Sequence, residues 1–344
     1  MGCRLLLARS SCKLGVIMKK IVLLAVAVFG WSSCRALDAS KMWGQEIPGS
    51  GKAVTVEHKL DEVSKVKFEI PGILVVEQGN EDRIFVSADD NLINLIKLNV
   101  KDGELCIALD LSDPIRPASP MQFHLFVNKL SDIKIVGGSQ QVEVGAIKNR
   151  DFGVELVGSG TVHLVDVEAS RFKVKVQGTG NVLAEVVKSN NVKLDIVGEG
   201  GIGVKNVFTN KLKIESAGSG KIGVRGILAK ELEADVKGAG FIECDGRADL
   251  QDIKFSGAIT YRAQGLFAKD TKVKLDGANN IAIYTTGTLE VDENGSNKID
   301  SKGNPKVVNL NKPASLKRTS VRRHGRIRMP EDVSLSDEKP SDER

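Results

Sequence analysis

Three carboxylates recur at intervals of twenty residues, and oxygen ligands in such a row could hold a calcium ion. They are Asp195, Glu215 and Asp235. In coils of that length they would lie in consecutive turns, about 4.8 Å apart. Calcium takes about six to eight oxygens, however, and Lys193 and Lys213 stand two residues before the first two acids, with Lys173 one repeat earlier. We therefore expect weak surface ion pairs and assign no metal site.

Two glycine motifs have the spacing of a dinucleotide-binding loop, G-x-G-x-x-G. They cover residues 198–203 and 218–223. A loop of this kind must end a strand and open a helix whose N-terminus faces the pyrophosphate. The residues that follow alternate between apolar and polar, which is typical of a strand, and the same glycines recur in other repeats. We interpret them as structural corners and expect no nucleotide or other cofactor.

Side chains suited to catalysis do not gather elsewhere in the sequence. The four histidines have no metal-ligand spacing, and no G-x-S-x-G elbow is present. Acids do not cluster with Arg or Lys in neighbouring repeat positions, as a polysaccharide-cleaving β-helix would require. Tyr261 and Tyr284 are the only tyrosines, and Trp43 is the only tryptophan after the leader. Because stacking platforms for sugars are scarce, a strong lectin-type site is disfavoured, and Tyr261 is expected in the core. The sequence predicts a protein that is not an enzyme.

A glycine repeat sets the elements that would position any site. A first glycine comes about every twenty residues, and five of these marks carry a second glycine two residues later. Such short-period self-similarity is typical of a solenoid, whose repeats bury their apolar faces against their neighbours. We interpret the glycines as corners, where a positive φ or a close backbone approach excludes a Cβ. The first glycines are Gly138, Gly158, Gly178, Gly198, Gly218, Gly238, Gly257, Gly277 and Gly295; the second are Gly160, Gly180, Gly200, Gly220 and Gly240.

Apolar residues keep fixed positions within the repeat. Four residues after each first glycine, one such column reads Val142, Val162, Val182, Ile202, Ile222, Ile242, Tyr261, Ile281 and Ile299. Neighbouring apolar residues are spaced by two, which predicts short strands with one buried face. The fold class we predict is all-β: a right-handed parallel β-helix of about 20 residues per coil over 137–311. A less regular, non-repeating β region over 50–136 precedes it.

Charge is concentrated at the two ends of the chain. The formal net charge is +5, but the first 33 residues contain five bases and no acid, and residues 312–344 contain nine bases against six acids. The body between them is therefore about three charges negative, so a basic footprint for nucleic acid is missing. The 312–344 segment has almost no apolar periodicity and is predicted to be a disordered tail.

A leader is predicted over residues 1–36. Lys19 and Lys20 precede an apolar stretch over 21–29, and small residues follow, which is the layout of a secretory signal peptide. A start at Met18 would give the more ordinary signal length. The apolar stretch is shorter than the ~20 residues of a spanning helix. We expect export to the periplasm, the outer membrane or the cell surface.

Cysteine placement bears on anchoring and on redox state. Cys34 follows two serines, as in a bacterial lipobox, although Trp31 stands where such motifs usually have Leu. Cys34 is thus a candidate lipidation site, and membrane contact is expected only through such an anchor. Ordinary signal peptidase cleavage near Ala36 is the alternative. Cys106 and Cys244 remain in the body, and we expect two buried thiols rather than a disulfide.

Several segments are similar to those of one known family. They are V-E-L-V-G-S-G-T-V-H-L (154–164), V-K-V-Q-G-T-G-N-V (174–182), I-E-S-A-G-S-G-K-I (214–222), D-E-V-S-K-V-K-F-E-I-P-G (61–72) and K-G-N-P-K-V-V (302–308). Over roughly residues 55 to 310 the chain resembles the head-GIN-domain family, whose suggested role is that of an autotransporter adhesin. The resemblance implies an exported bacterial β-solenoid, often a lipoprotein, with no catalytic residues to transfer. The basic tail and the segment before Met18 depart from the family pattern.

The function we expect is therefore a non-enzymatic adhesin or surface interaction module. A carbohydrate-binding or polysaccharide-cleaving β-helix is the alternative, and a purely structural envelope role is a third reading. The partner is left open between a surface protein and a glycan, as is the oligomeric state.

Overall fold

The computed structural model describes residues 46–110, 114–309 and 316–318. The predicted leader, with Met18 and the candidate lipidation site Cys34, lies outside the described residues, as does Trp43. Most of the predicted tail does too, but Leu316–Arg318 within it forms a short strand, β22, paired in parallel with β20. The described residues from Pro48 onward belong to one compact unit.

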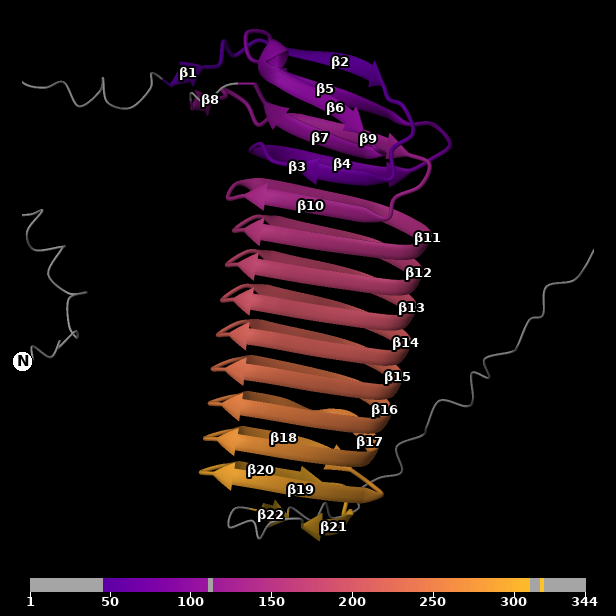
Figure 1. Ribbon diagram of the computed structural model, residues 1–344, viewed down its shortest axis with the longest axis vertical. Helices are drawn as coiled ribbons and strands as arrows, with labels where there is room; N and C mark the ends of the chain where they lie inside the picture. The colour runs from indigo at the N-terminus through magenta and orange to yellow at the C-terminus, as the bar shows by residue number, and fades with distance from the viewer. Residues whose placement is uncertain (1–45, 111–113, 310–315, 319–344) are drawn as a thin grey trace, which may run out of the picture. The chain divides into compact units, whose positions relative to one another are not determined.

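The repeats are stacked coils, each built from one long strand that bends (Figure 1). Every coil pairs in parallel with the next, so that Val162 aligns with Val182 and Val182 with Ile202. The predicted parallel β-solenoid is therefore confirmed. The single-strand coils are β11 (Gln140–Gly158), β12 (Thr161–Gly178), β13 (Asn181–Gly198), β14 (Gly201–Gly218), β15 (Lys221–Gly238), β16 (Phe241–Gly257) and β17 (Thr260–Gly277).

At the C-terminal side of the stack the coils divide into shorter strands. β18 (Asn280–Thr285) and β19 (Thr288–Gly295) both pair with β17. β20 (Lys298–Lys302) then pairs with β18, and β21 (Lys306–Asn309) pairs with β19.

The non-repeating region begins the same stack. β3 pairs in parallel with β10, and β4 pairs in parallel with β11, so the ladder does not stop at residue 137. Antiparallel pairs of β2 with β5 and of β6 with β7 complete this region. Its elements are β1 (Ile47–Pro48), β2 (Ala53–Lys59), β3 (Lys65–Phe68), β4 (Gly72–Gln78), β5 (Arg83–Asp89), the 3₁₀ turn η2 (Ile93–Leu95), β6 (Ile96–Lys101), β7 (Glu104–Leu109), β8 (Ile115–Arg116), β9 (Gln122–Val127) and β10 (Asp132–Gly137).

Inward and outward side chains alternate along each coil, and the alternation breaks at the bends. In β12, neither Val165 nor Asp166 is buried, and neither is the pair at 170–171. Each coil thus has three straight stretches, and the side chains between them face outward in pairs. The inward side chains stack on their equivalents: Ile222, 1% exposed, aligns with Ile202 and Ile242. Burial of these columns between coils supplies most of the stabilisation.

The two glycines of each corner serve different purposes. Gly178 has φ +117°, and a Cβ there would lie 2.6 Å from the carbonyl oxygen of Gly158 in the coil before. Gly180 has no positive φ; instead, a Cβ there would meet the Leu156 side chain at 2.6 Å and the Gly160 oxygen at 2.8 Å. The two expected reasons for a corner glycine are thus divided, with a positive φ at Gly178 and a close approach at Gly180. In the earliest corner the positive-φ residue is Gly137, which aligns with Gly158, rather than Gly138.

The interior becomes polar toward the C-terminal coils. Gln251, Thr271 and Thr285 are buried, and the two threonine hydroxyls lie 2.7 Å apart. The Gln251 amide donates a hydrogen bond to the Tyr261 hydroxyl, so Tyr261 fills the core as expected. Cys244 is buried in an adjacent position, and burial raises the pKa of its thiol to about 12. It and Cys106 are both free thiols, and Cys106 is only half-buried.

Candidate functional site

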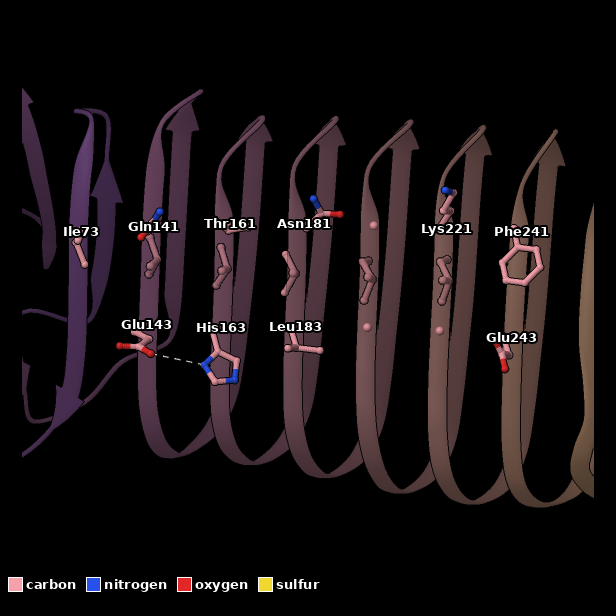
Figure 2. A pocket seen from close by; sticks show the side chains of 18 residues that line it. Ile73, Gln141, Glu143, Thr161, His163, Asn181, Leu183, Lys221, Phe241 and Glu243 are labelled. Atoms are coloured by element: carbon pink, nitrogen blue, oxygen red, sulfur yellow. Dashed lines mark ion pairs between the residues drawn. The ribbon is translucent and has the colours of Figure 1, made fainter. Parts of the chain in front are cut away.

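A groove with a volume of about 750 Å³ runs across the outer face of the first stretch of consecutive coils. It extends from β4 to β16, and two rows of outward-pointing residues line it on either side of a buried apolar column (Figure 2). One row of its lining is Gln141, Thr161, Asn181, Gly201, Lys221 and Phe241, and the other is Glu143, His163, Leu183, Gly203, Gly223 and Glu243.

Missing side chains create the groove. Outward positions of a solvated sheet normally carry polar side chains, but Gly201, Gly203 and Gly223 leave the backbone of β14 and β15 bare. A Cβ at Gly223 would meet nothing within 4 Å, so the floor is open there. Leu183, 39% exposed, stands on one side of the floor and Phe241 on the other. The result is an apolar floor between two apolar walls.

Ion pairs occupy one end of the groove. The Nε2 of His163 lies 3.0 Å from Glu185 Oε1, and its Nδ1 lies 3.8 Å from Glu143. Lys205 also pairs with Glu185 at 2.6 Å. The hydrogen bond from Lys205 first, and that from His163 second, hold the pKa of Glu185 below its ordinary value. These charges stabilise one another laterally between coils.

The other end of the groove carries a cation and an aromatic ring. Lys221 points outward from β15, beside Phe241 of the next coil (Figure 2). The Arg262 guanidinium lies 5.2 Å from the centre of the Phe241 ring, on the coil beyond. Such a cation–π contact holds the ring in place. This end therefore offers apolar surface next to positive charge.

The three carboxylates predicted from the sequence lie away from the groove, on the last stretch of the coils. Asp195 aligns with Glu215, and Glu215 with Asp235. Lys193 and Lys213 both pair with Glu215, the latter at 2.8 Å. Among the described residues no group of three or more His, Cys, Asp or Glu side chains is arranged to hold a metal ion.

The structure places the two G-x-G-x-x-G motifs at corners. β13 ends at Gly198 and β14 begins at Gly201, so a strand follows the glycines where a nucleotide-binding loop requires a helix. The carbonyl of Gly178 accepts a hydrogen bond from the backbone N–H of Glu199 in the next coil. The corner's backbone groups are thus used to stack the coils.

The charged row predicts acid sensitivity. Lys193, Lys213 and their hydrogen bonds lower the pKa of Glu215 from its ordinary 4.5. A carboxyl with a lowered folded-state pKa contributes stability above its unfolded pKa, and this is lost as the pH falls through the folded value. We expect the thermal midpoint to hold at neutral pH and to fall below about pH 4.5. Glu215→Gln should lower the neutral-pH midpoint and flatten this acid limb.

Glu199→Gln is the matched control, since Glu199 is an exposed acid at a corner. Thermal midpoints of the wild type and both variants, measured by circular dichroism at several pH values, would show whether Glu215 contributes to the acid sensitivity. An acid limb in Glu215→Gln as steep as in the wild type would contradict the assignment.

These features define a parallel β-solenoid with an open groove on one face. The family model "Putative auto-transporter adhesin, head GIN domain" matches residues 63–225 and 182–305. The chain belongs to this family, as the sequence segments suggested. No curated protein is significantly similar to the chain in sequence.

Solved structures share the fold. A "putative adhesin" from Bacteroides fragilis is 22% identical, with a TM-score of 0.57 over 63% of this chain and 99% of that one. A "putative adhesin" from Parabacteroides merdae is 16% identical, with a TM-score of 0.55 over 80% of this chain and 99% of that one. In the described part of the chain, helices of the length and apolarity needed to cross a membrane are absent.

Proposed function

We propose that the protein is an exported, non-enzymatic adhesion module that holds its partner in the groove. Membership of a family described in terms of adhesion supports this role. The observation that carries it is the bare floor of Gly201, Gly203 and Gly223 between Leu183 and Phe241. An extended ligand segment can lie flat there, with apolar contact to both walls and a polar group near Lys221.

The coils hold this surface rigidly, which favours binding. Each of the central coils is hydrogen-bonded along its whole length to the coil before and the coil after. The lining residues therefore keep fixed spacings along the stack, and little conformational entropy is lost when a partner binds.

Filling the groove tests the proposal. Gly223→Gln places a side chain on the floor where a Cβ meets no neighbour, so the fold is expected to persist. On an array of glycans and extracellular matrix proteins, full-length protein should bind a defined subset of spots, and Gly223→Gln should lose at least ten-fold of that signal.

Gly145→Gln is the matched control, because Gly145 is outside the groove and its Cβ would have only an ordinary contact, 3.5 Å from the Val76 oxygen. Equal binding by wild type and Gly223→Gln, with Gly145→Gln unchanged, would remove the groove from the function.

A polysaccharide-cleaving activity is the rival role, and it gives a separate prediction. We expect no unsaturated product, detected by ultraviolet absorbance, when the protein is incubated with polygalacturonate or alginate. At one end of the groove His163 is already engaged with Glu185 of the next coil, and Lys221 and Glu243 come from different coils and different rows of the lining. The assay is run with and without Ca²⁺, and a rise in absorbance that scales with protein concentration would favour a lyase.

The proposal includes the localisation of the protein. We propose that residues 1–36 direct export and are removed, that Cys34 is the lipidation candidate, and that the chain after β22 forms a tail outside the solenoid. Mass spectrometry of the mature N-terminus distinguishes a lipidated Cys34 from ordinary cleavage.

A further inference from the structure

A second surface feature lies on the middle stretch of the coils, outside the groove. One outward column changes character along the stack: its first members are Lys148, Glu168 and Lys188, and the next are Phe208, Leu228, Arg247, Phe267 and Tyr284. We call Phe208, Leu228, Phe267 and Tyr284 the apolar stripe. The first three are 45%, 48% and 50% exposed. The Tyr284 ring packs edge-on against Phe267, with their centres 4.8 Å apart.

The fold does not require apolar side chains in this column. In the earlier coils the same position carries an ion pair, Lys148 with Glu168 at 2.8 Å. Those coils nevertheless stack with the same parallel register. Large exposed apolar side chains in neighbouring coils, here Phe208 next to Leu228 and Phe267 next to Tyr284, expose apolar surface to water and mark interaction sites. We therefore expect a ligand to cover the apolar stripe.

Basic side chains lie beside the stripe and within its column. Arg225, Lys230 and Lys269 lie beside it, and Arg247 lies in the column between Leu228 and Phe267; all four are exposed. None of these four makes an ion pair or side-chain hydrogen bond with another described residue, in contrast to Lys148 or Lys205. Three of the nearby acids already have partners: Asp245 accepts a hydrogen bond from the Gly226 N–H, Asp270 accepts one from the Thr288 N–H, and Glu231 pairs with Lys211. The fourth, Asp249, is exposed. The four basic side chains have no such partners in the described part of the chain and are available to a ligand.

We propose that the apolar stripe and these basic side chains bind an acidic polysaccharide that runs along the stack of coils. The column places one large side chain in each coil, about every 4.8 Å, with Arg247 among the apolar ones. This spacing suits a linear polymer with a regular short repeat and acidic groups. A pyranose ring presents an apolar C–H face that packs on Phe208, Leu228 or Phe267, and its carboxylate or sulfate reaches Arg225, Arg247 or Lys230. Arginine suits such planar oxyanions because its guanidinium donates in a fork.

A membrane surface fits this feature less well. The stripe is one residue wide, and the exposed polar residues Asn206 and Asn210 stand on either side of Phe208. Insertion into a bilayer would bury these amides along with the phenyl ring, at a cost in desolvation. A narrow polymer covers the ring and leaves the amides in water. The site is independent of the groove, so the proposal stands whether or not the groove binds a partner.

The test uses full-length protein and polygalacturonate as the probe, with affinities measured by calorimetry. We expect binding that weakens as salt rises, and at least a ten-fold loss in Phe208→Ser/Phe267→Ser. Arg225→Gln/Arg247→Gln should lose a similar factor. Val165→Ser/Val197→Ser is the matched control, since these valines are both 46% exposed and lie outside the stripe. It should bind as the wild type does, as should the groove variant Gly223→Gln.

Three further probes separate the alternatives: neutral dextran, polyglutamate and vesicles containing phosphatidylglycerol. Weak or no binding of all three supports the proposal. Polyglutamate bound as tightly as polygalacturonate, with no effect of the phenylalanine changes, would overturn it in favour of charge attraction alone. Vesicle binding that is lost in Phe208→Ser/Phe267→Ser, without polygalacturonate binding, would replace it with a membrane role.

Discussion

Replacement of Ile222 by aspartate is expected to lower the free energy of unfolding by roughly 3–5 kcal/mol, the cost of an unpaired charge in a protein interior. Ile222 is 1% exposed and lies between Ile202 and Ile242 in the coils on either side. A carboxylate there would meet only hydrocarbon, because the inward neighbours in this part of the stack are apolar. It would either remain charged without a partner or take up a proton.

The thermal midpoint, measured by circular dichroism, should fall by several degrees or more. Lys221→Asp introduces the same side chain one residue away, on the outer face, and is expected to change stability by about 0.5 kcal/mol or less. Ile222→Val, which removes only one methylene, should cost about 1 kcal/mol. A midpoint shift for Ile222→Asp no larger than that of Lys221→Asp would show that the column is not interior.

Substitution of a corner glycine by alanine is expected to have the second-largest effect. Gly198 has φ +122°, and a Cβ there would lie 2.6 Å from the carbonyl oxygen of Gly178. That oxygen already accepts the hydrogen bond from Glu199, so it cannot move away without loosening the corner. The backbone strain alone costs roughly 1–3 kcal/mol for Gly198→Ala, and the clash with the neighbouring coil adds to it.

Gly223→Ala provides the control within the next coil. Gly223 lies near the start of β15, within the strand, and a Cβ there meets nothing within 4 Å. We expect this variant to match the wild type or to gain a few tenths of a kcal/mol, because alanine has less conformational freedom in the unfolded chain. Denaturant midpoints of the two variants compare them directly, and similar midpoints would argue against the assigned corner geometry.

The solenoid could be predicted from the sequence because each residue that marks the repeat is constrained by one structural requirement only. The column of Val142, Val162 and Val182 is apolar because it is buried, and its spacing identified strands and register without further information. A position with a single constraint leaves a regular pattern. Gly178 is also of this kind, since the positive φ admits few other residues.

The separate roles of the two corner glycines and the presence of the groove could not be predicted from the repeat pattern. Gly178 and Gly180 look alike in the sequence. The structure shows that Gly178 is needed for its positive φ, whereas Gly180 is needed because Leu156 packs close to its Cα. The groove arises because Gly203 and Gly223 fall at outward positions, where no repeat requires glycine. That irregularity was a usable signal, but the more frequent corner glycines masked it.

The exposed phenylalanines were missed for a different physical reason. The sequence argument against sugar stacking rests on the scarcity of tyrosine and tryptophan. Phe208 and Phe267 lie in a column that begins with the charged residues Lys148 and Glu168, so the repeat does not mark them as exposed. Phenylalanine in a strand is more often buried than exposed, so its side of the sheet had to be known first. The strands' exact alternation around each bend supplied that information.

The parallel register, in which each coil meets the next through an offset of about twenty residues, gives the stack a translational symmetry. Removal or duplication of one whole coil would bring together two surfaces of the same kind as those that already touch. The length of the stack, and with it the reach of any surface along it, can therefore change in steps of about 4.8 Å without a new fold. Duplication of a segment that encodes one coil is therefore a simple evolutionary route to a longer protein with the same fold.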